Sequence, residues 1–200
     1  MHHTSRGPRR PRLAAALLPA AMLLTLPGIA RAQSAQPFAV QLSGLVTTAE
    51  AAGKRVAGFG VELQQRFNRV YASETFGAAS IGIGMQYTVH TRAQDKLKIT
   101  GVFIEPRWVP PTGSSQVFPY LSARVVVQRL RGEFQFAEEG STNGSMIGLG
   151  GGLAVKLSRI ANVDAGVQLV RQQFGSLGVL NFTPYMTYAA KVGISLGYPR

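Results

Sequence analysis

The sequence feature that most limits how this chain can fold is an alternation of apolar and polar residues, repeated from Pro37 to Tyr198. In the segment Val56–Phe67, for example, Val61 and Leu63 share one face, while glycine, glutamine and charged residues occupy the other. Successive side chains of a β-strand point to opposite faces, so the pattern predicts strands with one apolar and one polar face. A soluble sandwich buries the bulky face, whereas a membrane barrel turns it to lipid and packs small and polar groups inside.

The first 32 residues have the three regions of a secretory signal peptide. Met1–Arg12 is basic and has no acid, Leu13–Ile29 is apolar, and Ala30-Arg31-Ala32 is a small-x-small cleavage site. Pro19 and Pro27 interrupt the apolar stretch and argue against a permanent membrane helix. We therefore predict a cleaved leader over residues 1–32 and one exported domain over residues 33–200.

The charge balance of the exported domain is basic, because 16 of the 21 Lys and Arg residues lie outside the leader, against nine acids. These charges are dispersed along the alternating segments, without a basic helix or an aromatic platform, so we expect no nucleic-acid partner. Anionic lipid headgroups are the simpler partner for such residues. The absence of cysteine excludes disulfides and thiolate metal sites, and closure of all strands in a membrane would supply the stability instead.

Turn signals divide the alternating region into eight segments. Each is longer than the about 9–11 residues that a tilted, membrane-spanning strand needs. An even number of antiparallel strands can close a sheet without leaving an edge. The predicted fold is all-β, an eight-stranded antiparallel up-and-down transmembrane β-barrel. Its predicted strands are Pro37–Thr48, Val56–Phe67, Thr75–Thr91, Lys96–Val109, Gln116–Arg131, Gly144–Ser158, Val163–Phe174 and Phe182–Tyr198.

The predicted strand Lys96–Val109 is irregular, because Leu97 and Ile99 share one parity, whereas Val102, Ile104 and Trp108 share the other. The intervening Gly101 suggests a β-bulge at which the alternation changes phase.

Two segments resemble a known family. The segment Gly148–Leu169, GLGGGLAVKLSRIANVDAGVQL, is a glycine-rich strand, a short turn and a second alternating strand, and Val117–Val127 is a strand opened by Pro-Tyr. Both are similar to the OmpA-like or porin-like outer membrane β-barrel proteins. The resemblance implies a bacterial outer-membrane location, with outer membrane lipids and the barrel-assembly machinery as partners. Family members usually end on an aromatic residue, whereas here Pro199-Arg200 follows Tyr198.

The polar face should fill the barrel interior, which in an eight-stranded barrel is just wide enough for side chains. Acids and bases placed there should pair, because an unpaired buried charge is costly. This predicts a salt-bridge plug, with a narrow pore as the alternative. The expected interior charges are Glu62, Arg66, Glu105, Arg107, Arg124, Lys156, Asp164 and Lys191, and the expected lipid-facing residues include Leu63, Ile81, Val167, Val192 and Ile194.

Catalytic chemistry has little support in the sequence. His90 is the only histidine after the leader, and we expect it near a strand end, facing solvent. Nothing in the spacing of Ser80, Ser176 or Glu138 brings a nucleophile and an acid to this histidine. We therefore expect no catalytic residue, no metal site and no cofactor.

With the N-terminus in the periplasm, the odd-numbered connections face outward, and the longest predicted one is Gly132–Asn143. It carries Phe134, Phe136 and the pair Glu138-Glu139, so a surface-interaction role would reside there, with an unknown partner. We predict a structural or surface-interacting outer membrane barrel. The alternatives are an exported lipocalin-like barrel that binds an apolar ligand inside, a narrow pore, and a lipid-modifying enzyme.

Overall fold

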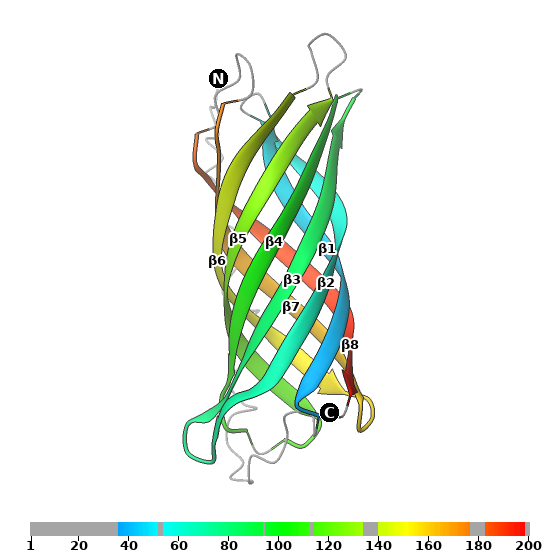
Figure 1. Ribbon diagram of the computed structural model, residues 1–200, viewed down its shortest axis with the longest axis vertical. Coiled ribbons are helices and arrows are strands. Elements are labelled where there is room, and N and C mark those ends of the chain that lie inside the picture. The colour runs from blue at the N-terminus through cyan, green and yellow to red at the C-terminus, as the bar shows by residue number, and fades with distance from the viewer. Residues whose placement is uncertain are drawn as a thin grey trace, which may run out of the picture.

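The chain forms a closed barrel of eight tilted strands, shown in Figure 1. The computed structural model describes residues 36–51, 54–93, 95–112, 114–133, 140–176 and 183–198. Each strand pairs antiparallel with the next one in the chain, and β8 pairs with β1 to close the sheet. The strands are β1 (Phe38–Ala51), β2 (Lys54–Ser73), β3 (Gly77–Arg92), β4 (Asp95–Val109), β5 (Val117–Glu133), β6 (Gly140–Lys156), β7 (Ala161–Phe174) and β8 (Tyr185–Tyr198).

Both ends of the strand sequence lie at the same mouth of the barrel, because Phe38 pairs with Tyr198. We call this mouth the terminal end; it is the lower one in Figure 1. The opposite mouth, where β1 meets β2 and β7 meets β8, is the far end. Within the described ranges, the structure has no helix that is both long and apolar enough to cross a bilayer.

The alternation of the sequence becomes an inside–outside alternation in the wall. In β2, the side chain of Val61 is 55% exposed on the outer face, whereas that of Glu62 is 1% exposed and points inward. The same division holds in β8, where Val192 is exposed and Lys191 is buried. The bulky apolar face therefore covers the outside of the barrel.

The strand boundaries differ from the prediction mainly at the ends. β2 continues to Ser73, beyond the predicted end at Phe67, and β6 begins at Gly140. The predicted connection Gly132–Asn143 is therefore wrong in extent, since strand pairing continues to Gly132 and Gly140 and leaves only 134–139 between the strands. The longest connection is instead 175–184, between β7 and β8.

The predicted bulge at Gly101 is also wrong. β4 pairs with β3 in one continuous register from Asp95 to Val109, and Leu97 and Ile99 are buried inside the barrel. The alternation of side-chain direction never changes; what changes is the chemistry of the inward face, which becomes apolar. The register irregularity lies elsewhere, between Phe67 and Tyr71 where β2 pairs with β3.

The interior is layered along the barrel axis. Charged residues lie toward the terminal end, and two clusters of buried apolar side chains lie toward the far end. The first cluster is Leu45, Phe103, Val126, Met146, Val170 and Ala189, and the second is Ala49, Leu97, Ile99, Leu130 and Phe174. The interior is thus part ionic network and part hydrophobic core.

Candidate functional site: an ionic interior and a basic collar

Glu105 of β4 is the centre of the interior network, and its side chain is fully buried. Its Oε1 accepts hydrogen bonds from Arg66 Nη2 at 2.9 Å and from Arg107 Nη2 at 3.3 Å. Its Oε2 accepts from Arg124 Nη2 at 2.5 Å and from Lys191 Nζ at 2.7 Å. Four bases from β2, β4, β5 and β8 therefore converge on one carboxylate.

Glu62 of β2 shares two of these bases. Its carboxylate accepts from Arg124 Nη1 at 2.7 Å and from Lys191 Nζ at 3.3 Å. The Arg124 guanidinium also lies 4.1 Å from the centre of the Phe103 ring, which belongs to the first apolar cluster. Arg124 thus joins the ionic layer to the hydrophobic layer above it.

Asp164 of β7 holds the part of the network nearest the terminal end. It accepts from Arg107 Nη1 at 2.5 Å and from the Tyr120 hydroxyl at 2.9 Å. The Arg107 guanidinium stacks 3.7 Å from the centre of the Tyr120 ring. The glycine-rich part of β6 makes this arrangement possible, because a Cβ on Gly152 would lie 2.5 Å from the Tyr120 hydroxyl oxygen.

Among the predicted interior charges, Lys156 is placed differently. It lies at the last position of β6, is only half-buried, and takes no part in the ion pairs found among the described side chains. The other seven are buried inside the barrel. Sequence reasoning missed the buried glutamines of this network, such as Gln86 and Gln168, which donate to or accept from its charged members.

The predicted lipid-facing residues all lie on the outer face. Leu63, Val167, Val192 and Ile194 are exposed, and Ile81 is half-buried there. Together with outward residues of the other strands they form an apolar band around the barrel, which we call the outer band.

Basic residues line the far end of the barrel on β2, β3, β4 and β5, beyond the outer band, and we call this group the basic collar. We define it as Arg55, Arg92, Lys96, Lys98, Arg129 and Arg131. On β4 and β5 these residues lie side by side, since Lys98 pairs in register with Arg131. Lys98 donates a hydrogen bond to Glu133, which lowers the pKa of the Glu133 carboxyl below its ordinary value.

His90 does not face solvent as the sequence suggested. Its side chain is buried on the inner face of β3, at the level of the second apolar cluster, and it pairs in register with Leu97. Ser80 lies on the same strand, ten positions away and beside Arg66. At roughly 3.3 Å per residue, about 30 Å of strand separates this serine from the histidine, while Glu138 lies outside the described residues.

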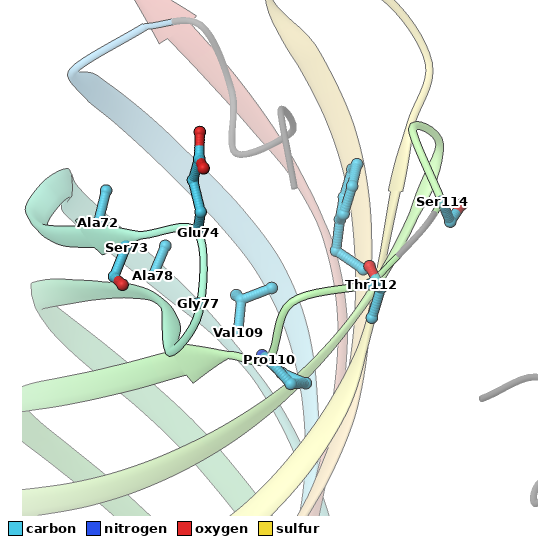
Figure 2. A pocket seen from close by; sticks show the side chains of 10 residues that line it. Ala72, Ser73, Glu74, Gly77, Ala78, Val109, Pro110, Thr112 and Ser114 are labelled. Carbon is cyan, nitrogen blue, oxygen red and sulfur yellow. The ribbon is translucent and has the colours of Figure 1, made fainter. Parts of the chain in front are cut away.

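The cavities inside the barrel are small. One interior cavity of about 60 Å³ lies at the terminal end, and another of about 10 Å³ lies between the ionic and apolar layers. A third, of about 160 Å³, lies outside the interior, between the β2–β3 turn and the segment after β4. Figure 2 shows Ser73, Glu74 and Gly77 on one side of this third cavity and Thr112 and Ser114 on the other. Among the described residues, no group of His, Cys, Asp and Glu is placed to hold a metal ion.

A closed eight-stranded antiparallel barrel with an apolar outer face is the fold of bacterial outer-membrane barrel proteins. Neisserial surface protein A has this fold with a TM-score of 0.66 at 15% identity, over 81% of this chain and 97% of that one. Ail, the attachment invasion locus protein of Yersinia pestis, matches with a TM-score of 0.54 at 11% identity, over 80% of this chain and 97% of Ail. The chain matches no family model, and no curated protein matches its sequence. The structural likenesses confirm the predicted fold class.

Proposed function

We propose that this protein is a structural and surface-interacting barrel of the bacterial outer membrane, with a plugged interior and no catalytic role. The observation that carries the proposal is the polarity of the wall. Leu63, Ile194 and Leu196 are 47%, 53% and 53% exposed on the outer face, while the charges of the ionic network are buried. An outer face of this kind is stable against lipid but not against water.

The lipocalin-like alternative requires the opposite polarity, with the same apolar residues lining an internal ligand cavity. Soluble monomers rarely expose a contiguous apolar patch larger than a few hundred Å². Here the outer band runs around the barrel, with exposed large apolar residues on each of the eight strands. A binding cavity for an apolar ligand would also need far more room than the 60 Å³ found inside.

Aromatic residues at the edges of the outer band favour the same environment. Tyr87 and Tyr188 are exposed toward the far end, and Trp108 is exposed at the terminal end of β4. Such residues concentrate at the two membrane–water interfaces of outer-membrane barrels.

The basic collar would meet the anionic headgroups of the outer leaflet. An exported chain whose barrel begins and ends at the terminal end would place that end in the periplasm and the far end outside the cell. Basic side chains near a membrane surface gain about 1 kcal/mol each from anionic lipid. The collar would therefore anchor the far end among phosphate-bearing glycolipids and leave the connections free to contact partners.

Membrane residence is tested by separating the membranes of expressing cells and by comparing boiled and unboiled samples on a denaturing gel. We expect the protein in the outer-membrane fraction and an unboiled band that migrates differently from the boiled one. Recovery in the soluble periplasmic fraction would overturn the proposal.

Orientation is testable because the chain has no cysteine, so that an introduced one is unique. Ser141→Cys places a thiol at the far end, and Ser115→Cys places one at the terminal end; both positions are exposed. On whole cells, an impermeant maleimide should label only the first variant, and both should react after lysis. Labelling of Ser115→Cys on intact cells, without Ser141→Cys, would reverse the orientation.

The plugged interior is tested by single-channel recording in planar bilayers. Because the ion pairs around Glu105 and the two apolar clusters fill the interior, we expect no conductance of porin size. Sustained conductance of that size in the wild-type protein would contradict the plug while leaving membrane residence intact.

A further inference from the structure

The interior network does not balance its own charge. Its three carboxylates are those of Glu62, Glu105 and Asp164. Its four basic side chains are Arg66, Arg107, Arg124 and Lys191. Among the described interior residues, one positive charge is therefore in excess. Buried charge without a counter-charge is costly in a low-dielectric interior, so the site favours a further negative charge.

Two guanidinium N–H donors without an acceptor indicate where this negative charge would lie. The Nε atoms of Arg66 and Arg107 are buried and have no hydrogen-bond acceptor among the described residues. Both arginines line the 60 Å³ cavity at the terminal end, which we call the mouth cavity. Unused guanidinium donors beside a cavity are what an anion requires, because each can give a charge-assisted hydrogen bond.

The remaining lining of the mouth cavity contains one acid, several neutral polar side chains and a few apolar ones, such as Val109 and Phe118. Asn68, Ser80 and Asn162 contribute amide and hydroxyl groups, and Asp164 is already engaged by Arg107 and Tyr120. The cavity lies at the level where β4 ends at Val109, so an ion could enter from the terminal end. Its volume is that of a few water molecules, which excludes bulky organic anions and leaves room for one small ion.

We propose that the mouth cavity binds one small monovalent anion, a halide such as chloride, between Arg66 and Arg107. One halide neutralises the one excess charge and uses the unpaired donors, whereas a divalent anion would reverse the imbalance. Water alone would satisfy the donors and would leave the charge uncompensated. The site goes beyond the structural and surface role, since it concerns how the interior is neutralised.

The test measures thermal unfolding of the refolded protein in detergent, with sodium gluconate, chloride or bromide at matched ionic strength. We expect chloride and bromide to raise Tm by a few degrees over gluconate, with a saturable dependence on halide concentration. Arg66→Gln should abolish this difference, and Arg159→Gln, at an exposed position at the same end, should preserve it. Equal Tm values in the three salts for the wild-type protein would overturn the proposal.

A second variant keeps the test decisive if Arg66→Gln fails to fold. Ser80 accepts a hydrogen bond from Arg66 Nη1 at 3.2 Å, so Ser80→Asp would place a covalent carboxylate beside the same guanidinium. We expect this variant to lose the halide dependence and to be as stable in gluconate as the wild type is in chloride. Crystals grown in bromide should show an anomalous peak in the mouth cavity; a map with water only at that position would contradict the site.

Discussion

Gly58 of β2 lies directly against the imidazole ring of His90 on β3. The two residues are paired in register, and a Cβ built on Gly58 would lie 2.2 Å from Cδ2 of the histidine. Both residues face the interior, where the ring of His90 is covered by the wall and by the apolar layer near Leu97. The absence of a side chain at position 58 is thus what admits an aromatic ring at position 90.

The first prediction is that Gly58→Ala destabilises the barrel. The added methyl group would force the histidine ring from its place, and such overpacking costs about 1–3 kcal/mol. Gly44→Ala is the matched control, because its Cβ would meet only the Val192 carbonyl oxygen at 3.8 Å. Urea unfolding in lipid vesicles measures both variants; equal stability of the two would contradict the close contact.

The second prediction concerns the two glutamates of the ionic network. Glu105→Gln removes the carboxylate that pairs with four bases, so it should cost about 3–5 kcal/mol in the free energy of unfolding. Glu62→Gln removes a carboxylate that pairs with two bases, Arg124 and Lys191, and should cost less. The same unfolding assay compares them. A larger loss for Glu62→Gln would show that Glu105 is not the centre of the network.

The third prediction concerns the outer band. Leu63→Arg places a charge on the lipid face near mid-membrane and should cost about 2–4 kcal/mol. Thr100→Arg is the control, since Thr100 is exposed among the collar residues and pairs in register with Arg129. A charge near the interface should cost about 0–1 kcal/mol. If both variants fold equally well in lipid, the outer band does not face a bilayer.

The fourth prediction separates strand from connection between β5 and β6. Replacing residues 134–139 with Asn-Gly should preserve assembly, because the strands remain intact and Asn-Gly suits a tight hairpin. Extending the replacement through Ser141 removes the pairing of Ser141 with Arg131 and of Gly140 with Gly132. We expect slower or incomplete folding, measured by the gel shift of unboiled samples. Identical folding of both variants would mean that these pairs do not support the wall.

The alternation of the sequence was sufficient to predict the fold, because a period of two assigns every residue of a strand to one side. It places Glu62 and Glu105 on the inward face, where the structure has them, and the bulky residues outside. Alternation does not determine how far a residue lies from the mouth. Lys156 has inward parity, yet it is the last residue of β6 and stays half-exposed.

The apolar interior layer could not be predicted in the same way. Leu97 and Ile99 have the parity of Glu105, so an apolar stretch of the inner face and a change of phase look identical in the sequence. The sequence favoured a bulge because the interior was expected to be polar throughout. His90 was misplaced for a different reason, because its position near a strand end suggested a solvent-facing loop edge. The leader over residues 1–32 and the last two residues lie outside the described residues and stay predictions.

The pairing of Lys191 with Glu105 has a consequence for the closure of the barrel between β8 and β1. Lys191 belongs to the last strand, Glu105 belongs to the fourth, and the two groups meet across the interior at 2.7 Å. A slip of one residue in the β8–β1 register would turn the lysine outward to lipid. A slip of two would carry it about 7 Å along the wall, beyond reach of the carboxylate. The ion pair between Glu105 and Lys191 therefore favours the correct β8–β1 register, because only that register brings the fourth base to the central carboxylate.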